Sequence, residues 1–456
     1  MKRALIAVAF LVSTATLART QTTLAGDWQG ALSVNGGELH LAVHIQKNDD
    51  GSFKATLDSI DQGARGIPVT SIALTGTTLT LGVGAVGGKY EGTLNADATV
   101  IDGVWTQNGG SMPLVLKRGA NAVAVETKRP QNPVKPYPYR EEDVTYDNTA
   151  AHITLAATLT TPAGPGPFPA VLLITGSGPQ DRDESLAGHR PFLVLADYLT
   201  RRGMAVLRVD DRGVAKSGGN FASATTADFA TDAEAGVAYL RTRREVDAKK
   251  IGLIGHSEGG MIAPMVAARN TAVAFIVLMA GPGVPGEDIL LAQNTLLAQA
   301  AGVPEEQITQ NTALLKGVFE ILKEEKDEAR LQTRLRERLT GTMPPEMISV
   351  QIRTLTSPWY RYFVAYDPAP ALKRLTCPVL AINGERDMQV PPKLNLPAIR
   401  SALEASGNKN VEVTELPGLN HLFQTAKTGA PNEYAQIEET MSPVALDTIA
   451  RWILKR

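Results

Sequence analysis

The chain has very little cysteine and almost no excess of charge. Its 456 residues include one cysteine, Cys377, so an intrachain disulfide is excluded. The 45 basic and 47 acidic residues leave a formal net charge of −2, and no global field therefore attracts nucleic acid or an anionic membrane. We expect Cys377, which precedes an apolar strand, to be a buried structural thiol. A small uncharged molecule is the natural partner of such a surface.

A long hydrophobic run is also missing at the N-terminus. Met1-Lys2-Arg3 precedes an apolar run from Ala4 to Val12, which is too short for a comfortable membrane span. Small residues follow up to Ala18, and no cysteine follows for lipid attachment. This pattern predicts a secretory signal peptide over residues 1–18, cleaved near Ala18. We expect a secreted or periplasmic protein with no integral membrane segment after cleavage.

The region after the signal peptide has short runs that alternate apolar and polar residues. Half-buried antiparallel strands are predicted at residues 39–45, 53–57, 72–74 and 79–81. Gly-x-Trp units around Trp28 and Trp105 stand near the two ends of the region. We predict an all-β domain over residues 19–119, a small barrel or sandwich closed by its first and last strands.

Two histidines on one of these strands raise the question of a metal site. His40 and His44 are four residues apart, which places them on one face but about 13 Å apart at ~3.3 Å per residue. One ion cannot bridge that distance, so no metal site is expected.

A proline-rich linker over residues 120–140 separates this domain from a catalytic domain over residues 141–456. Strands and helices alternate in the second domain, as in a parallel sheet built from βα units. The rhythm stops between residues 282 and 370, where helical patterns predict a cap. An aromatic cluster at residues 358–363 either walls an acyl pocket or packs in the core.

The sequence Gly-His-Ser-Glu-Gly, residues 255–259, follows an apolar strand and leads into a helical pattern. This is the context that a G-x-S-x-G nucleophile turn requires, so Ser257 is the candidate nucleophile. A serine hydroxyl needs a base, and in the α/β-hydrolase order the acid and the histidine follow the serine. His421 is the one histidine beyond Ser257, which names it as the base.

The triad also needs a carboxylate. The strand before Gly384 ends in Glu385-Arg386-Asp387, where a carboxylate can emerge at the active edge of the sheet. Asp387 is our choice for the acid, and Glu385 is the alternative. Either could instead pair with a neighbouring basic residue.

Two backbone amides should stabilise the oxyanion. The first is the N–H of Glu258, directly after the nucleophile. The second is the N–H of Ser177 in a glycine-rich loop, with Gly178 as the next choice. We expect the charged residues after this loop and those at 210–212 to brace loops, and His189 to line the entrance of the site.

Several ordered motifs now form one pattern. G-H-S-E-G-G, T-G-S-G-P-Q-D-R-D, V-D-D-R-G with K-S-G, N-G-E-R-D and G-L-N-H together resemble a bacterial α/β-hydrolase family of esterase-like proteins, often called serine aminopeptidase-like, over roughly residues 137–456. The resemblance implies an eight-stranded, mostly parallel sheet with helices on both sides, a helical cap, and ester hydrolysis without a cofactor. It implies a triad of Ser257, Asp387 and His421, with the amides of Ser177 and Glu258 as the oxyanion hole.

We therefore expect a carboxylesterase that acts on small acyl esters through an acyl-serine intermediate. An exopeptidase or amidase with the same triad is the alternative, and a binding protein with a vestigial hydrolase domain is a third. The expected partner is a small-molecule ester, and a nucleic acid is not. The sequence leaves open the natural substrate and whether the chain forms a homo-oligomer.

Overall fold

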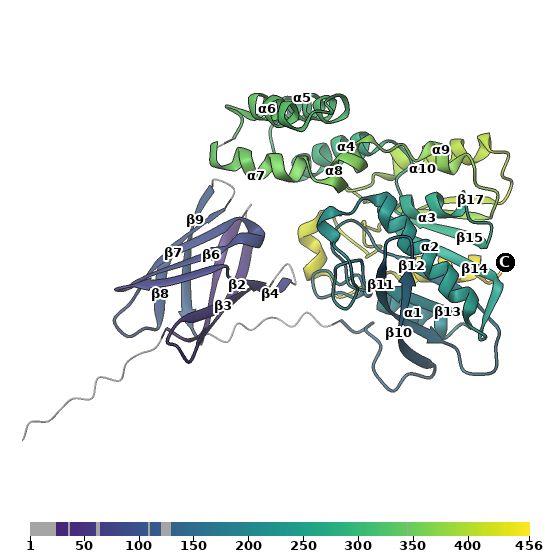
Figure 1. Ribbon diagram of the computed structural model, residues 1–456, viewed down its shortest axis with the longest axis horizontal. Coiled ribbons are helices and arrows are strands. Elements are labelled where there is room, and N and C mark those ends of the chain that lie inside the picture. Colours follow the sequence, from purple (N-terminus) through teal and green to yellow (C-terminus); the bar gives the residue numbers. More distant parts are fainter. Residues whose placement is uncertain (1–23, 35–36, 61–63, 108–109, 120–128, 344) are drawn as a thin grey trace, which may run out of the picture. The chain divides into compact units, whose positions relative to one another are not determined.

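The computed structural model describes residues 24–34, 37–60, 64–107, 110–119, 129–343 and 345–456. The chain divides into two compact units, one within residues 1–121 and the other mainly within residues 122–456 (Figure 1). The predicted signal peptide and residues 120–128 of the predicted linker lie outside the described residues. In the described part of the chain, no helix combines the length and apolar character needed to cross a bilayer.

The first unit is a nine-stranded sheet in the order β4-β3-β2-β1-β9-β8-β7-β6-β5. Its strands are β1 (Gly26–Val34), β2 (Gly37–Lys47), β3 (Phe53–Ser59), β4 (Ala64–Pro68), β5 (Ser71–Thr75), β6 (Thr78–Val83), β7 (Gly88–Leu94), β8 (Val100–Gln107) and β9 (Gly110–Arg118), with a short 3-10 turn, η1 (Gly84–Val86). The first and last strands pair antiparallel, as predicted.

The core of this unit forms because apolar residues alternate along each strand. Trp28 and Trp105, the two tryptophans noted in the sequence, are both buried in it. The Tyr90 hydroxyl, also buried, donates to the carbonyl oxygens of Ile101 and Leu114 at 3.0 and 3.1 Å. The predicted all-β domain is confirmed, and its strands β2, β3, β5 and β6 cover the four predicted strand segments.

The second unit contains an eight-stranded sheet in the order β10-β11-β13-β12-β14-β15-β16-β17. The strands are β10 (Arg140–Asn148), β11 (Ile153–Thr161), β12 (Phe168–Ile174), β13 (Ala205–Val209), β14 (Val246–His256), β15 (Val273–Met279), β16 (Val379–Gly384) and β17 (Val411–Leu416). β10, β11 and β13 pair antiparallel, and the strands from β13 to β17 pair parallel. This is the predicted α/β-hydrolase sheet.

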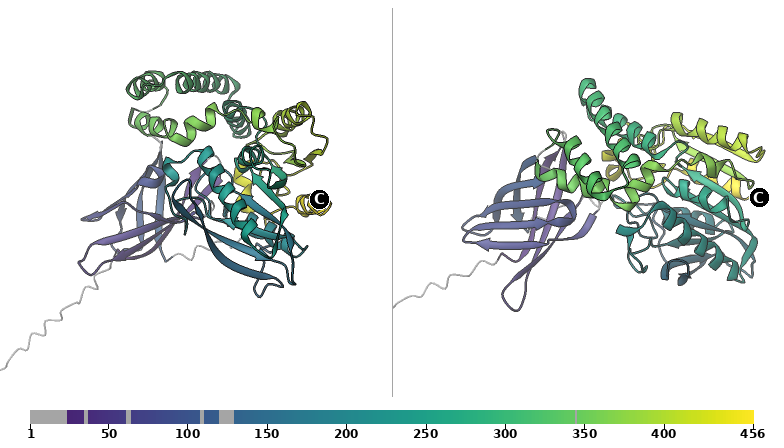
Figure 2. Two further views of the ribbon diagram at one scale, coloured as in Figure 1. Left: turned by 45° about the vertical axis from the view of Figure 1, so that its right-hand side comes forward. Right: turned by 45° about the horizontal axis from the view of Figure 1, so that its top comes forward.

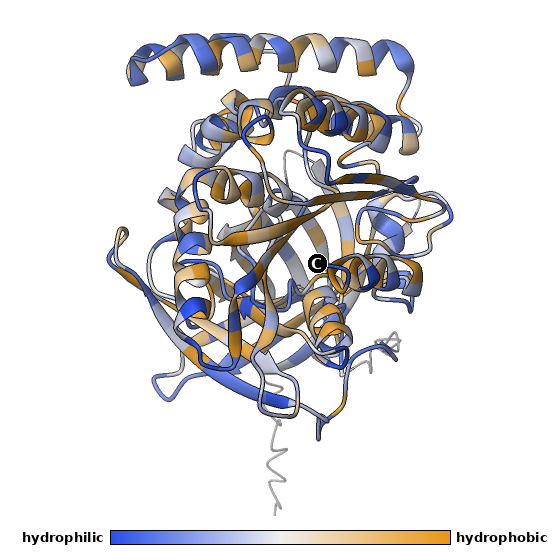
Figure 3. Cartoon of the chain, turned by 90° about the vertical axis from the view of Figure 1, so that its right-hand side faces the viewer, coloured by the Kyte–Doolittle hydropathy of each residue, from blue (hydrophilic) through white to orange (hydrophobic). Residues whose placement is uncertain are grey.

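Helices cover both faces of that sheet because its central strands are apolar on both sides (Figure 3). One face packs against α1 (Pro191–Thr200) and α11 (Pro443–Ile453). The other packs against α2 (Thr226–Thr242), α3 (Gly259–Ala267), α9 (Ala369–Leu372) and α10 (Pro392–Ala405). Two short 3-10 turns, η2 (Phe221–Ser223) and η3 (Pro431–Gln436), lie in the connections.

A helical cap follows β15, as predicted. It consists of α4 (Gly286–Ala300), α5 (Glu305–Glu324), α6 (Glu328–Leu339), α7 (Pro345–Leu355) and α8 (Pro358–Ala365). These helices, green in Figures 1 and 2, lie together in every view. They enclose a core of their own, built from apolar residues at helical spacing such as Val318, Leu322 and Leu335. The cap is therefore a folded layer with its own core. After α8, the last cap helix, the chain returns to the sheet.

Candidate active site

The turn between β14 and α3 holds Ser257 in a strained backbone conformation. Its φ is 53°, in the left-handed region that side chains other than glycine rarely adopt. A side chain at Gly255 would meet the carbonyl oxygen of Gly259 at 2.0 Å, and one at Gly259 would meet the carbonyl oxygen of Ile174 at 2.2 Å. The turn therefore requires small residues on both sides of the serine. Ser257 itself is half-buried at the end of the strand.

His421 contacts a fixed carboxylate. Its Nδ1 atom lies 2.8 Å from Oδ2 of Asp387, and both side chains are buried. The other carboxylate oxygen, Oδ1, accepts the backbone N–H groups of Gln389 and Val390, each at 2.8 Å. Because a carboxylate only accepts, it holds the proton of His421 on Nδ1 and leaves Nε2 as the basic nitrogen.

Glu385, the alternative acid, has a different partner. Its Oε2 atom accepts the backbone N–H of Gly418 at 2.8 Å. It therefore braces the turn that follows β17, while Asp387 is the carboxylate that the structure brings to His421.

The His421 loop lies against the nucleophile turn. The Nε2 atom of His256, the residue before Ser257, is 3.0 Å from the carbonyl oxygen of His421. The two imidazole rings are 4.8 Å apart between centroids. The strands β14, β15, β16 and β17 are parallel neighbours, so the segments that follow them meet at one edge of the sheet. Residues far apart in the sequence converge there.

The loop after β12 approaches the same point. A Cβ atom placed on Gly176 would lie 3.2 Å from the Cβ of Ser257, so the loop passes directly beside the candidate nucleophile. Ser177 is exposed there, and Gly178 follows with φ of 100°. The Ser177 side chain also acts on the carboxyl group of Glu258 and lowers its pKa.

The carboxylate of Glu258 is buried, with 2% of the residue exposed. It accepts the Thr226 hydroxyl at 2.7 Å and the indole N–H of Trp359 at 2.8 and 2.9 Å. Burial raises the pKa of Glu258, while these hydrogen bonds and the Ser177 side chain oppose the rise. Trp359 lies on α8 and stacks on Phe363, so the cap reaches the nucleophile turn through this indole.

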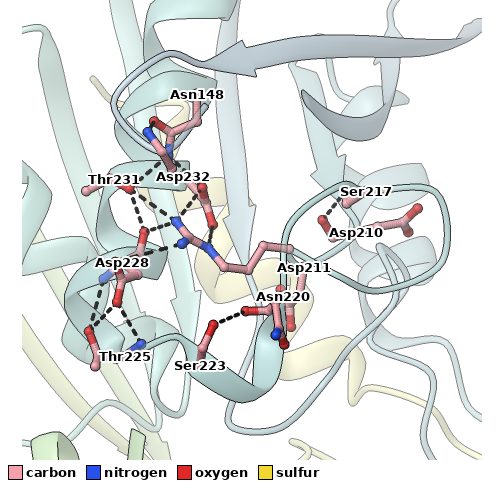
Figure 4. Close-up of polar contacts among 12 residues, drawn as sticks. Asn148, Asp210, Asp211, Ser217, Asn220, Ser223, Thr225, Asp228, Thr231 and Asp232 are labelled. Atoms are coloured by element: carbon pink, nitrogen blue, oxygen red, sulfur yellow. Dashed lines mark hydrogen bonds and ion pairs between the residues drawn. The ribbon is translucent and has the colours of Figure 1, made fainter. Parts of the chain in front are cut away.

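The charged residues near the active edge form the bracing network that the sequence predicted. Arg182 donates to both oxygens of Asp210 at 2.9 and 2.7 Å. Arg212 donates to both oxygens of Asp232 at 2.7 and 2.9 Å, and Asn148 donates to Asp232 at 2.7 Å (Figure 4). These bidentate pairs fix the loops after β12 and β13.

Asp211 has a different environment. Its oxygens accept the Thr175 hydroxyl at 2.7 Å and the backbone N–H of Gln180 at 2.9 Å. Burial raises the pKa of Asp211 to about 8, and the nearby carboxylates of Glu184 and Glu258 contribute to the rise. Asp211 therefore links the end of β12 to the loop that carries Ser177 and Gln180.

The expectation for His189 is wrong. Instead of lining an entrance, the residue is completely buried. Its ring nitrogens lie 2.9 Å from the Thr440 hydroxyl and 2.8 Å from the carbonyl oxygen of Tyr434. A bridge to Leu186 closes a tight turn that directs the imidazole into the C-terminal segment. Burial lowers the pKa of His189 to about 4, so the ring is neutral at pH 7.

Among the described residues, no cluster of three or more His, Cys, Asp or Glu side chains is arranged to hold a metal ion. In the first unit, His44 lies 2.7 Å from Asp27 and 3.3 Å from Asp58, which are its ion-pair partners.

Comparison with known proteins gives the family. Residues 151–405, more than half of the chain, match the family model described as X-Pro dipeptidyl-peptidase (S15 family). The chain belongs to this S15 family. Esterase EstD of Thermotoga maritima is 31% identical over 326 residues, which cover 71% of this chain and 69% of that protein. The S15-family chain is therefore a serine hydrolase with the α/β-hydrolase fold, related to bacterial esterases.

Solved structures are similar at a lower level. An esterase of Pyrococcus furiosus has a TM-score of 0.41 and 15% identity, over 70% of this chain and 93% of that one. Est1E of Butyrivibrio proteoclasticus, solved with ferulic acid bound, has a TM-score of 0.40 and 18% identity, over 68% of this chain and 98% of that one. The fold of the S15-family chain is assigned from its own strand order.

Two residues at this site were missed in the sequence, and the role of a third was left open. Thr226, Glu184 and Trp359 all contact the nucleophile turn or its neighbour. Thr226 and Glu184 carry no motif signal. Trp359 belongs to the aromatic cluster noted in the sequence, and its hydrogen bond to Glu258 shows that this tryptophan does more than pack in the core.

Proposed function

We propose that the protein hydrolyses small carboxylic esters through an acyl-serine intermediate on Ser257. The observation that carries this proposal is the 2.8 Å contact between His421 Nδ1 and Asp387 Oδ2, made by a histidine loop that packs against the nucleophile turn. A histidine with its tautomer fixed in this way is suited to take a proton from a neighbouring serine.

The reaction follows from these groups. His421 Nε2 accepts the proton of Ser257 while the serine oxygen attacks the ester carbonyl, and Asp387 stabilises the imidazolium. The backbone N–H groups of Ser177 and Glu258 stabilise the oxyanion. His421 then returns the proton to the leaving alcohol. In the second half of the reaction, His421 takes a proton from a water molecule, which attacks the acyl-serine, and then returns this proton to the oxygen of Ser257 as the acid is released.

An X-Pro peptidase is the second candidate, because the family description names that activity. Such an enzyme needs an acidic group to receive the free amino terminus of its substrate. The carboxylate closest in sequence to the proposed nucleophile, Glu258, already accepts hydrogen bonds from Thr226 and Trp359 and is buried. Because the carboxylate of Glu258 is already occupied by these hydrogen bonds, it does not offer a site for a charged amino terminus, and this favours an uncharged ester as the substrate.

The decisive experiment replaces the nucleophile. Ser257→Ala should lower turnover of short p-nitrophenyl esters by about 10⁴-fold or more, as expected when a triad member is removed. Ser401→Ala, at an exposed position of α10, is the matched control and should keep full activity. A fluorophosphonate probe should label the wild type and the control but not Ser257→Ala. Full activity in Ser257→Ala would end the proposal.

Substrate class is tested separately. Wild-type enzyme is assayed on a panel of alkyl esters and on X-Pro anilides under the same conditions. We expect a higher kcat/KM for the esters. A higher kcat/KM for the anilides would assign the peptidase activity instead.

We also propose that the protein is exported, on the sequence of residues 1–18. Mass spectrometry of the protein from its native host should find an N-terminus near residue 19. An intact Met1 on the mature protein would contradict export by this signal.

A further inference from the structure

The imidazole of His256 contacts an acceptor at each nitrogen. Nδ1 lies 2.9 Å from Oε1 of Glu184, and Nε2 lies 3.0 Å from the carbonyl oxygen of His421. Oε1 of Glu184 also accepts the backbone N–H of Gly176 at 2.7 Å. The side chains of His256 and Glu184 are both buried, with 6% and 5% of their surfaces exposed.

These contacts decide the charge of the ring. A neutral imidazole carries one N–H and one lone pair, so one of its two contacts would place a lone pair against an acceptor oxygen. A carbonyl oxygen has no proton to donate, and Glu184 Oε1 already receives the N–H of Gly176. Only the imidazolium, with two N–H groups, donates to both neighbours. His256 and Glu184 then form a buried ion pair.

Each partner of this pair belongs to a different part of the catalytic apparatus. His256 precedes the nucleophile, Gly176 precedes the oxyanion residue Ser177, and the carbonyl oxygen is that of the base, His421. We propose that His256 is a protonated positioning residue, which with Glu184 holds the oxyanion loop, the nucleophile turn and the His421 loop in one arrangement. This inference rests on the proposed function of Ser257 and His421.

The backbone supports the assignment. Glu184 has a φ angle of 53°, in the left-handed region that residues other than glycine rarely adopt. Such a conformation is strained and persists where the surrounding structure requires it. Here it brings a charged side chain into the interior beside His256, which is a costly arrangement unless the charge is paired. Phe423, on the His421 loop, has φ of 61° and packs its ring edge-on against His256.

The groups that face His256 set its titration. They are Glu184 from the loop after β12, Asp387 from the segment after β16, and His421 from the segment after β17. Burial lowers the pKa of His256, but the charge and hydrogen bond of Glu184, with smaller contributions from the His421 carbonyl and Asp387, raise it above its ordinary value. The protonated form of His256 is therefore favoured below the pKa of the folded state, and is lost as the pH rises through that pKa.

The charge is measured directly on the wild-type enzyme. Protein labelled with ¹⁵N in histidine has six imidazoles, and the His256 signals are assigned by their loss in His256→Asn. If that variant does not fold, Glu184→Gln identifies the same signals because it removes their charged neighbour. We expect both ring nitrogens of His256 to be protonated at pH 7. One unprotonated nitrogen at that pH would overturn the proposal.

Kinetics test the positioning role. His256→Asn and Glu184→Gln should lower kcat for p-nitrophenyl acetate by on the order of 10- to 100-fold with little change in KM, because small displacements of reacting groups have effects of this size. The alkaline fall in wild-type activity should coincide with the His256 titration and be absent in His256→Asn. His152→Asn, in the turn between β10 and β11, is the control and should match the wild type.

The two proposals fail in different ways. A pH profile in His256→Asn that is identical to that of the wild type would reject positioning by a charged His256. The NMR measurement uses no substrate, so its result stands whether or not the enzyme hydrolyses esters. Failure of the proposed function would instead appear as full esterase activity in Ser257→Ala.

Discussion

Replacement of Asp387 by asparagine tests the site most sharply. In the wild type, Oδ1 of this carboxylate accepts two backbone N–H groups, those of Gln389 and Val390, and Oδ2 faces His421 Nδ1. An asparagine must place its single oxygen at the two backbone donors. Its NH₂ group then faces His421, and the histidine is forced to accept at Nδ1 and to carry its proton on Nε2.

A histidine in that tautomer cannot accept the proton of Ser257. The expected loss in kcat is about 10⁴-fold, the size known for tautomer reversal in a serine triad. This loss corresponds to about 5.4 kcal/mol of transition-state stabilisation at 1.36 kcal/mol per factor of ten. The fold should survive because the two backbone hydrogen bonds are retained.

The assay is turnover of p-nitrophenyl acetate at pH 7, with thermal unfolding to establish that the variant is folded. Glu385→Gln is the matched control, because Glu385 is the neighbouring carboxylate that binds Gly418 instead of His421. It should keep activity within about threefold, as expected for a loop residue outside the proton path. A folded Asp387→Asn enzyme with more than about a tenth of wild-type turnover would refute the reasoning, as would an equal loss in Glu385→Gln.

Two further changes concern buried carboxylates. Trp359→Phe removes a donor to Glu258 and should lower the free energy of unfolding by about 1.5–3 kcal/mol in urea titrations. Trp452→Phe is its control, because that buried indole N–H has no partner in the described chain; an equal loss there would show that the indole ring, and not the hydrogen bond, matters. For Asp211, burial raises the pKa from about 3.8 to about 8, so the unfolded state loses its proton first and stability falls as the pH rises between these values. Asp211→Asn cannot ionise, so its unfolding free energy should fall less than that of the wild type between pH 5 and pH 8; equal slopes would contradict the assignment.

Local patterns were sufficient to predict the elements of this protein. The strand-turn-helix around Ser257 depends on residues that are adjacent in the sequence, and so do the apolar runs that become β12, β14 and β16. The loss of the strand-helix rhythm after β15 predicted the cap, and period-two alternation predicted the first unit. His421 followed from the order of residues and from the scarcity of histidine.

The tertiary structure was needed wherever two segments that are distant in the sequence meet. The sequence places Glu385 and Asp387 in the same loop, but the register of β16 against β17 directs one to His421 and the other to Gly418. The sequence also suggested that His189 lines the entrance of the site, but a tight turn buries this residue. Glu184 and Trp359 acquire their roles from contacts across 72 and 101 residues of chain. Composition and periodicity report on neighbours along the chain, whereas hydrogen-bond partners at this site are set by how the sheet brings its loops together.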